Sequence, residues 1–393
     1  MSDKIIKLGL FGFGCVGQGL YDVLQLSNGI KAEIVKICIK NPEKIRKLPK
    51  TLFTTKPSEI LHNPDIEVIV ELIDDAEAAW QIAFQTLTSG KTLVSANKKM
   101  ISEHLPELLD LQEKYGGKLL YEGACCASIP IIRNLEEYYD NDLLTSVEGI
   151  FNGSTNYILD KIFDERKSFN HALKDAQDQG YAESDPRLDT QAFDPVSKLS
   201  IIIMHAFGQH IPDSKIPRLG IDRINDFDVN FAREKGWRIK LVAHSRRTNP
   251  GITAWCLPKF IHKNDVLFSV KDAYNGVSLQ SIFSESQFFL GKGAGSHPTG
   301  SAVLSDISAL SYNYRYEYKK RKQSKLDLQL SDSILKVYIR FQHNGEDIRN
   351  SLLTIDEEHI SHSASYFTGT IRLNQLSTAT WFNNRDVNLI VMQ

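Results

Sequence analysis

The residues best suited to bind a substrate or to catalyse a reaction lie between Asn152 and Lys198. A Gly153-Ser154-Thr155 turn opens this segment, a tyrosine and carboxylates follow, and Lys198 precedes the largely apolar run 199–203. Because such a run is normally buried, we expect Lys198 to lie at the edge of a core and to face a cleft. Carboxylates suit an ammonium group, backbone N–H groups suit a carboxylate, and a lysine can stabilise an oxyanion and deliver a proton. The segment is therefore predicted to hold a small, charged substrate.

Each of these features also has a purely structural interpretation. A lysine at the start of a helix is commonly a solvated surface residue. Asp185-Pro186 by itself commonly marks a turn. A catalytic role for Lys198 therefore requires a cleft and suitable partners around it.

A dinucleotide-binding motif opens the chain. Residues 4–11 have the pattern of a buried strand, Gly12-Phe13-Gly14-Cys15-Val16-Gly17 follows at once, and apolar residues then continue with helical spacing. This is the context that the G-x-G-x-x-G fingerprint requires. Gly12 permits the tight turn, Gly14 lets the backbone approach the pyrophosphate, and Gly17 lets the helix pack closely on the strand. The pyrophosphate would meet the free N–H groups of the helix N-terminus.

The cofactor preference depends on the end of the second predicted strand, residues 33–39. NAD-specific sites usually place Asp or Glu there, but this chain continues with the basic stretch Lys40-Asn41-Pro42-Glu43-Lys44-Ile45-Arg46-Lys47. The cations favour a 2′-phosphate and hence NADP, while a solvated basic loop explains them equally well. Farther on, the strand 92–95 runs toward Lys98, which is thereby expected near the nicotinamide ribose or the substrate.

Strands and helices alternate through the first third of the chain, which predicts a mostly parallel sheet. In the second half, strands are expected at 146–151, 238–243, 252–257 and 267–270, and a long helix over 195–207 carries Lys198. A second glycine-rich stretch, residues 291–295, either contacts the cofactor from the other side or forms a simple turn. Residues 315–325 are interpreted as a solvated connector to a small terminal domain with strands 334–341, 366–372 and 387–392.

Composition narrows the class of protein. Lys and Arg (46) nearly balance Asp and Glu (48), so no global field favours nucleic acid or anionic lipid. The longest apolar runs are too short to span a membrane, and the N-terminus leaves no room for a secretory signal before its first strand. Five scattered cysteines without zinc-ligand spacing indicate reduced thiols. We expect a cytoplasmic enzyme with no nucleic-acid or membrane partner.

Taken in order, the motifs resemble those of the homoserine dehydrogenase family from Lys4 to about Asp306. The matching stretches are Gly12-Phe13-Gly14-Cys15-Val16-Gly17, Ser95-Ala96-Asn97-Lys98, Tyr121-Glu122 with Ile129-Pro130, Phe151-Asn152-Gly153-Ser154-Thr155-Asn156-Tyr157-Ile158-Leu159, Tyr181-Ala182-Glu183-Ser184-Asp185-Pro186, Asp194 with Lys198, and Gly291-Lys292-Gly293-Ala294-Gly295 with Pro298-Thr299. The resemblance implies NAD(P)H-dependent interconversion of L-aspartate 4-semialdehyde and L-homoserine, in threonine, methionine and isoleucine biosynthesis, by a homodimer or dimer-based oligomer.

The resemblance also implies roles for individual residues. Lys198 would be the proton donor to the aldehyde oxygen, assisted by Lys98, with Asp194 and Glu183 as further catalytic residues. The implied substrate-binding residues are Gly153, Ser154, Tyr181, Glu183, Asp189, Asp194 and Lys198. The implied cofactor-binding residues are Gly12, Gly14, Cys15, Val16, Gly17, Lys40, Ser95, Lys98 and Gly293. A sodium ion would be held by Glu122 and the backbone carbonyls of Cys125, Ala127 and Ile129.

The implied fold class is α/β, in three parts. Residues 1–133 would form an NAD(P)-binding Rossmann domain. Residues 134–312 would form an α+β substrate and dimerisation domain with an open sheet, whose last helix could pack back on the Rossmann domain. Residues 313–393 would form a linker and a small C-terminal α+β domain, loosely similar to an ACT domain, so threonine feedback is left open.

Several positions depart from the family pattern. Bulkier residues stand at Cys126-Ala127-Ser128 where glycines are usual, Asp74-Asp75 replaces a common Gly-Gly, Ser154 replaces a common threonine, and Ala192 replaces a usual glycine. None of these changes removes a charged catalytic group.

Two rival functions remain at this stage. One is another two-domain NAD(P)-dependent amino-acid or semialdehyde dehydrogenase. A phosphorylating member of that class needs a nucleophilic cysteine with a histidine base, whereas Cys125-Cys126 lie in an apolar loop and His205 lies on an apolar helix. The other rival is a non-catalytic NAD(P)-binding sensor, which would have no need to retain Lys98, Glu183, Asp194 and Lys198 together.

Overall fold

In the computed structural model the chain forms two compact units. The first consists of Met1–Asp140 with Lys292–Lys319, and the second of Asn141–Gly291 with Lys320–Gln393. No helix in the described part of the chain is long and apolar enough to cross a membrane. The structure describes residues 5–141, 143–323, 327–330, 333–343, 345–362 and 364–392.

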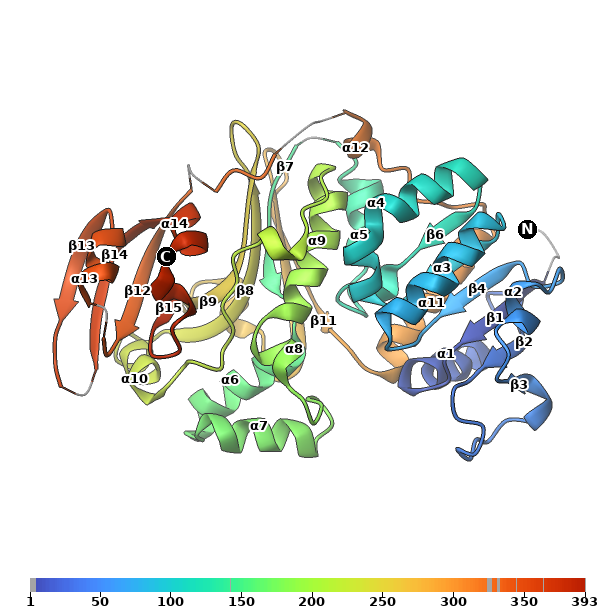
Figure 1. Ribbon diagram of the computed structural model, residues 1–393, viewed down its shortest axis with the longest axis horizontal. Coiled ribbons are helices and arrows are strands. Elements are labelled where there is room, and N and C mark those ends of the chain that lie inside the picture. The colour runs from blue at the N-terminus through green and yellow to red at the C-terminus, as the bar shows by residue number, and fades with distance from the viewer. Residues whose placement is uncertain are drawn as a thin grey trace. The chain divides into compact units, whose positions relative to one another are not determined.

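A six-stranded parallel sheet forms the centre of the first unit (Figure 1), which confirms the predicted Rossmann-type organisation. The strand order is β3-β2-β1-β4-β5-β6. This order reverses direction between β1 and β4, the point at which doubly wound sheets bind ligands beyond the carboxyl ends of their strands. The strands are β1 (Ile6–Phe11), β2 (Ala32–Cys38), β3 (Phe53–Thr54), β4 (Val68–Glu71), β5 (Thr92–Ser95) and β6 (Lys118–Leu120).

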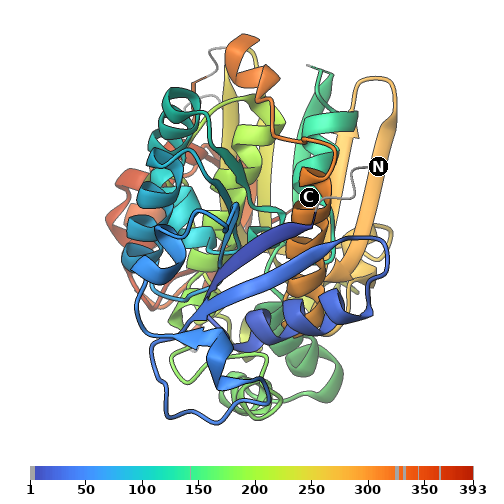
Figure 2. The ribbon, with the colours of Figure 1, turned by 90° about the vertical axis from the view of Figure 1, so that its right-hand side faces the viewer.

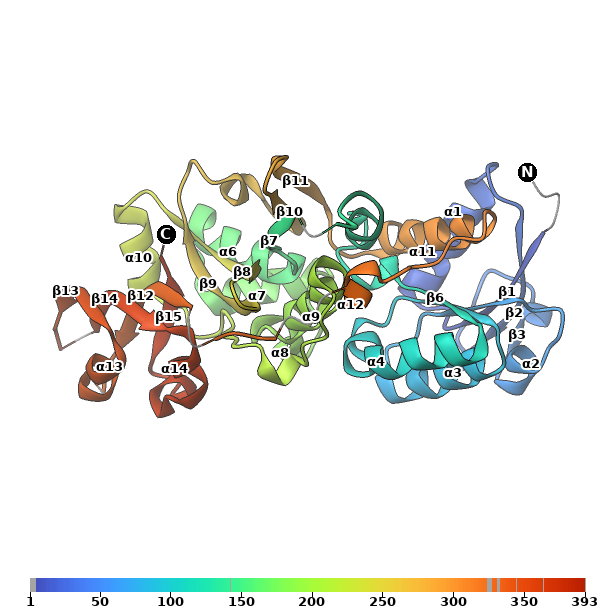
Figure 3. The ribbon, with the colours of Figure 1, turned by 90° about the horizontal axis from the view of Figure 1, so that it is seen from above.

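Helices cover both faces of this sheet, α1 and α11 on one face and α3 and α4 on the other (Figure 3). The helices of the first unit are α1 (Cys15–Leu26), α2 (Ser58–Leu61), α3 (Ala76–Thr88), α4 (Lys98–Tyr115), α5 (Ile131–Arg133) and α11 (Ser296–Leu310), with short non-α turns at η1 (Lys50–Leu52), η2 (Glu122–Ala124) and η3 (Asn134–Tyr138).

Helix α11 comes from far along the chain and packs directly on α1 (Figure 2, orange and dark blue). Two glycines permit this close approach. A Cβ atom on Gly19 would lie 2.1 Å from the carbonyl oxygen of Ser296, and one on Gly300 would lie 2.5 Å from the backbone nitrogen of Leu20. This packing places α11 in the first unit, whereas the second predicted domain extended to residue 312 and allowed its last helix to pack back.

The second unit contains a nine-stranded sheet with the order β11-β10-β7-β8-β9-β15-β12-β14-β13. Its C-terminal strands continue the sheet because β15 pairs in parallel with β9, at Val391 and Lys259. Strands β12, β13, β14 and β15 therefore extend the sheet of the second unit, where the sequence predicted a separate small domain. The strands are β7 (Leu144–Ile150), β8 (Arg238–Arg247), β9 (Ile252–Ile261), β10 (Tyr274–Ser281), β11 (Glu285–Lys292), β12 (Ile334–Phe341), β13 (Thr354–His359), β14 (Ser365–Arg372) and β15 (Asn388–Val391).

The long helix predicted over 195–207 is confirmed as α9 (Phe193–Phe207), in which every residue from Asp194 to Phe207 is buried. The strand predicted over 267–270 is wrong. Asp265 accepts a hydrogen bond from the backbone N–H of Leu267 at 2.9 Å and turns the chain into a 3-10 helix. The remaining helices are α6 (Gly153–Glu165), α7 (Phe169–Asp178), α8 (Arg187–Thr190), α10 (Asp226–Glu234), α12 (Lys319–Gln323), α13 (Gly345–Ser351) and α14 (Leu373–Thr378), with 3-10 turns at η4 (Asp213–Lys215), η5 (Val266–Ser269) and η6 (Thr380–Asn383).

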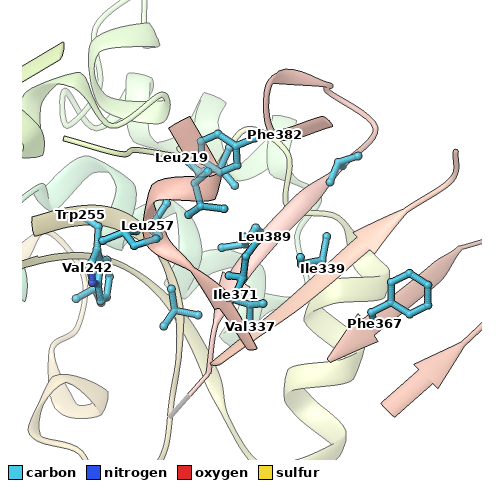
Figure 4. Close-up of a cluster of buried hydrophobic side chains, with 14 of the residues drawn as sticks. Leu219, Val242, Trp255, Leu257, Val337, Ile339, Phe367, Ile371, Phe382 and Leu389 are labelled. Carbon is cyan, nitrogen blue, oxygen red and sulfur yellow. The ribbon is translucent and has the colours of Figure 1, made fainter. Parts of the chain in front are cut away.

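A single apolar cluster joins the C-terminal strands to β8 and β9 (Figure 4). Val242, Trp255 and Leu257 on one side meet Val337 and Ile339 on the other. Burial of several such side chains contributes roughly 1.5–3 kcal/mol each, which explains why the C-terminal strands belong to the second unit.

A buried polar network reinforces the same junction. The fully buried Asp228 of α10 accepts hydrogen bonds from Tyr338 Oη at 3.1 Å, Arg340 Nε at 2.9 Å and Asn388 Nδ2 at 2.8 Å. Buried charges of this kind are tolerated because each has a bonded partner. The network therefore anchors β12 and β15 on α10.

Candidate functional site

The centre of the candidate site in the second unit is a buried ion pair, one turn apart on α9. Lys198 Nζ lies 2.8 Å from Asp194 Oδ2, and the two side chains are only 7% and 5% exposed. Lys198 Nζ also donates to the backbone carbonyl of Phe151 at 2.8 Å. Positions i and i+4 share one face of a helix, so α9 presents both groups to the end of β7. The carboxylate and the carbonyl offset the cost of burying the ammonium group.

Asn152 connects this pair to a second carboxylate. It lies two residues beyond the end of β7 and caps α6, because its Oδ1 accepts the backbone N–H of Thr155 at 2.9 Å. Its Nδ2 donates to Asp189 Oδ1 at 2.7 Å and to Asp194 Oδ2 at 2.8 Å. The sequence analysis gave Asn152 no role of its own. An asparagine between a strand and a helix does signal an N-cap, but its carboxylate partners depend on tertiary packing.

The Gly153-Ser154 turn at the start of α6 lies against two other segments. A Cβ atom on Gly153 would lie 2.5 Å from the carbonyl oxygen of Ala273, so no larger residue fits there without a shift. Ser154 Oγ donates to the carbonyl of Tyr181. The ring centroids of Tyr181 and Tyr157 lie 4.9 Å apart. These contacts attach the loop after α7 to the predicted substrate turn.

Glu183 and Asp185 lie on the exposed part of that loop. The backbone carbonyl of Glu183 accepts a hydrogen bond from Gln177 Nε2 at 3.0 Å. Arg187 Nε donates to both carboxylate oxygens of Asp185, at 2.8 and 3.0 Å, and this pairing lowers the pKa of Asp185 to about 2. The structure thus brings Asn152, Asp189, Asp194 and Lys198 together, while Glu183 stands on an exposed loop.

In the first unit, the three glycines of the predicted fingerprint have distinct local environments. Gly12 has φ +95°, and a Cβ atom there would lie 2.7 Å from the carbonyl oxygen of Leu72. A Cβ atom on Gly17 would lie 2.6 Å from the carbonyl oxygen of Gly12, whereas one on Gly14 would meet nothing within 4 Å. Helix α1 begins at Cys15 without a side-chain cap. The loop therefore leaves open space in front of uncapped helix N–H groups.

A buried carboxylate that the sequence analysis missed lies at the end of β4. Glu71 Oε2 accepts a hydrogen bond from Ser95 Oγ at 2.6 Å, and its Oε1 accepts the N–H of Ile73 at 2.7 Å. Burial raises the pKa of Glu71 to about 7, and the nearby Asp74 adds to the effect. The predicted cofactor residue Ser95 is thus fully buried, with its hydroxyl bonded to Glu71. The sequence does contain a signal for this buried carboxylate, because Glu71 is an acidic residue within an otherwise apolar run.

Lys98 is the first residue of α4 and is half-buried at the carboxyl end of β5. The preceding Asn97 fixes this helix start, since its Oδ1 accepts the N–H of Met100 and its Nδ2 donates to the carbonyl of Ile73, both at 3.0 Å. The N-cap at Asn97 therefore fixes where α4 begins, and with it the position of Lys98 at the carboxyl end of β5.

One of the basic residues in the loop after β2, Arg46, stabilises the loop itself. Arg46 Nη1 donates to the carbonyl oxygens of Asn41 and Lys44 at 2.9 and 2.7 Å. Lys40 is exposed at the start of this loop.

The second glycine-rich stretch meets the first one within the first unit. Gly293 lies between β11 and α11, and Ser296 Oγ donates to the carbonyl oxygen of Cys15 at 2.7 Å. On the other side, the backbone N–H of Ser128 donates to the carbonyl of Lys292 at 3.1 Å. These contacts bring the Gly293 loop to the start of α1.

The side chain of Glu122, a residue of the predicted sodium site, is hydrogen-bonded to the backbone. Its two carboxylate oxygens accept the N–H groups of Ile132 and Arg133, both at 2.9 Å. Burial, with Asp306 nearby, raises the pKa of Glu122 to about 8. In the described ranges no group of three or more His, Cys, Asp or Glu residues could hold a metal ion. The two hydrogen bonds tie the Glu122 side chain to α5.

Non-glycine residues nevertheless adopt the glycine-like conformations of that loop. Cys126 and Ala127 have φ of 53° and 40°. Ala192, at the start of α9, has φ 64°. These left-handed conformations explain why glycine would be the easier residue at each position.

Comparisons with known proteins cover both units. Residues 12–122 match the family model described as the NAD binding domain of homoserine dehydrogenase, and residues 130–308 match the model described as homoserine dehydrogenase. The homoserine dehydrogenase of Bacillus subtilis is 33% identical over 319 residues, covering 79% of this chain and 74% of that protein. That of Neisseria gonorrhoeae is 34% identical over 312 residues, covering 77% and 72%. The crystal structure of a homoserine dehydrogenase from Thiobacillus denitrificans has a TM-score of 0.87 at 27% identity, covering 99% of this chain and 98% of that one.

Proposed function

Because the chain belongs to the homoserine dehydrogenase family, NAD(P)-dependent oxidoreductases, we propose that Lys198 is the proton donor of its reaction. In the direction of reduction, a nicotinamide cofactor would supply the hydride that the aldehyde carbon of L-aspartate 4-semialdehyde accepts. The carbonyl oxygen then gains negative charge and takes up a proton to give L-homoserine. Lys198 suits both tasks, since its ammonium group carries the positive charge and the proton.

The observation that carries this proposal is the buried Asp194–Lys198 pair at the end of β7. The Phe151 carbonyl and Asp194 Oδ2 hold Nζ from two directions, each at 2.8 Å. Asn152 donates to the same Asp194 oxygen at 2.8 Å, and this second donor fixes the position of the carboxylate. An ammonium group held in this way is oriented before the substrate arrives, which is what electrostatic stabilisation of an oxyanion requires.

The substrate-binding residues belong to the same proposal. Asp189 and Asp194 would bind the ammonium group of the amino acid, joined by Glu183 from the exposed loop. Gly153 and Ser154 would bind its carboxylate at the N-terminus of α6, where backbone N–H groups favour anions. Tyr181 would line the pocket.

The cofactor would bind along the glycine loops of the first unit. The fingerprint at Gly12, Gly14 and Gly17, with Cys15 and Val16 at the start of α1, would hold the pyrophosphate. Lys98 would assist near the nicotinamide, with Ser95 behind it and Gly293 on the other side. Lys40 would favour NADP over NAD through the 2′-phosphate.

Other features of the family remain proposals for this chain. They are a homodimeric or dimer-based assembly, a cytoplasmic location and a role in threonine, methionine and isoleucine biosynthesis. A sodium site formed by Glu122 and the carbonyls of Cys125, Ala127 and Ile129 stays a prediction.

The proton-donor role is tested by homoserine-dependent reduction of NADP. Lys198→Ala should lower kcat by roughly 10²–10⁴-fold, the usual contribution of a general acid or base, with NADPH binding largely kept. Lys174→Ala, at an exposed position of α7, is the control and should keep its activity. Near-normal homoserine oxidation by Lys198→Ala would refute the mechanism. A wild-type protein that binds NADPH but oxidises no hydroxy amino acid would indicate a sensor.

Cofactor choice requires kcat/KM with NADP and with NAD. Lys40→Ala should lose efficiency with NADP and keep it with NAD, because only NADP carries the 2′-phosphate. If Lys40→Ala keeps the wild-type kcat/KM with NADP, the basic loop does not recognise the 2′-phosphate of the cofactor.

A further inference from the structure

A buried lysine that the proposed reaction does not use lies in β8. The side chain of Lys240 is 1% exposed. Its Nζ donates to Asn156 Oδ1 and Asp160 Oδ1, both at 2.7 Å, and to the carbonyl oxygen of Val270 at 2.8 Å. An ammonium group has three N–H donors, so each donor of Lys240 can meet one acceptor.

The acceptors belong to two segments that meet at this point. Asn156 and Asp160 lie one turn apart on α6, while Val270 precedes β10. Further hydrogen bonds join the same segments. Asn156 Nδ2 donates to the Asp272 carbonyl at 2.8 Å and to the Val270 carbonyl at 3.3 Å, and the Asp272 N–H donates to Asp160 Oδ2 at 2.8 Å. Lys240 therefore lies at the centre of a network that fixes α6 on the 270–272 segment.

The same two segments define the proposed substrate turn. Gly153 begins α6, three residues before Asn156, and its Cα approaches the chain at Ala273 so closely that a Cβ atom would lie 2.5 Å from the Ala273 carbonyl oxygen. A shift of α6 relative to residues 270–273 would therefore displace Gly153 and Ser154 directly.

We propose that Lys240 is a positioning residue, which holds the Gly153-Ser154 turn in place for the amino-acid substrate through Asn156, Asp160 and Val270. This inference rests on the proposed role of the turn in substrate binding. Lys240 itself would touch neither substrate nor cofactor, so its effect should appear in the affinity for the amino acid.

Charge on Lys240 is needed for the complete network, since a neutral amine has only two N–H donors. Burial lowers the pKa of Lys240 to about 8, with Arg238 and Lys271 acting in the same direction and Asp160 opposing them. Loss of the charge as the pH rises through about 8 would remove one of the three hydrogen bonds that Lys240 donates. The charged groups around Lys240 are Asp160 on α6, Arg238 on the same strand, Lys271 and Asp164, which pair with each other, and Lys259 opposite Lys240 in β9.

Lys259 provides a matched control. It is the direct cross-strand neighbour of Lys240, is 8% exposed, and pairs with Glu148 Oε1 of β7 at 2.7 Å. Lys259→Met would thus remove a similarly buried ammonium group from the same sheet, while its partner lies in the sheet and not on α6.

The experiment compares wild type, Lys240→Met and Lys259→Met. In homoserine oxidation, Lys240→Met should raise the KM for homoserine at least about 10-fold, since small displacements far from the chemistry can cost up to about 100-fold. The KM of Lys240→Met for NADP should stay within about twofold of the wild-type value. In Lys259→Met, the KM for homoserine and the KM for NADP should both stay within the same range. The wild-type KM for homoserine should rise between pH 7 and pH 9, and this rise should vanish in Lys240→Met. Amide hydrogen exchange across residues 153–165 should be faster in Lys240→Met only.

The outcomes separate this inference from the proposed function. Equal changes of KM and hydrogen exchange in the two variants would overturn the positioning role. If the wild type fails to oxidise homoserine, the proposed function is refuted, and the exchange comparison still decides whether Lys240 holds α6. If Lys240→Met does not fold, Asn156→Ala removes one acceptor and takes its place in both measurements, with the same expected and refuting results.

Discussion

Replacing Glu71 by glutamine should stabilise the protein at alkaline pH. Burial raises the pKa of Glu71 from its usual 4.5 to about 7 in the folded state. A carboxyl group with a raised folded-state pKa contributes its full stability below 4.5, and this contribution is lost as the pH rises through about 7. The difference, 7 − 4.5 = 2.5, corresponds to roughly 3 kcal/mol of unfolding free energy at pH 9 at about 1.36 kcal/mol per pKa unit. Glutamine carries no charge and avoids this loss.

Glutamine can also keep the contacts of the protonated acid. Its Oε1 can accept the N–H of Ile73, and its Nε2 can donate to the hydroxyl of Ser95 after that hydroxyl turns. The two proteins should therefore have similar stability at pH 5.

The assay is urea denaturation at pH 5 and pH 9, followed by circular dichroism. Glu67→Gln is the control, because Glu67 is exposed just before the same strand. Equal stability of Glu71→Gln and wild type at pH 9, or a less stable variant, would refute the reasoning. It would mean that the folded protein holds Glu71 ionised at little cost.

Three further substitutions test the cofactor loop and the C-terminal junction. Gly14→Ala should keep the melting temperature, because its methyl group would meet no atom within 4 Å, but should weaken NADPH binding in a fluorescence titration. Gly17→Ala should lower the melting temperature, because its methyl group would lie 2.6 Å from the Gly12 carbonyl oxygen; equal melting temperatures for the two variants would contradict this contrast. Asp228→Ala should cost roughly 3–5 kcal/mol in urea denaturation, because it leaves the buried Arg340 without its carboxylate; an unchanged midpoint would argue against this.

The sequence by itself determined the features that depend on neighbouring residues. The dinucleotide motif is a strand, three glycines and an amphipathic helix in direct succession, and Gly12 and Gly17 have the tight environments expected of them. The helix that carries Lys198 was equally clear, because an apolar run longer than a strand and preceded by Asp194-Pro195 predicts a buried helix. Hydrophobic period and backbone preference are local properties, so they can be read without knowing the fold.

Only the tertiary structure decided which side chains meet. Asn152 bonds to Asp189 and Asp194 across 37 and 42 residues, and Lys240 bonds to Asn156 across 84. The conformation of residues 267–270 also depends on contacts outside the segment. A strand was predicted there, but the Asp265 side chain stabilises a helical turn.

The organisation of the chain into units has the same origin. Helix α11 joins the first unit through glycines that let it approach α1, and β15 joins the sheet of the second unit through β9. Sequence patterns indicate which face of an element is buried, but they do not identify the distant element that covers it. That choice is made by shape, hydrogen bonding and buried area when the whole chain packs, and it determined both the partners of Lys198 and the course of the C-terminal strands.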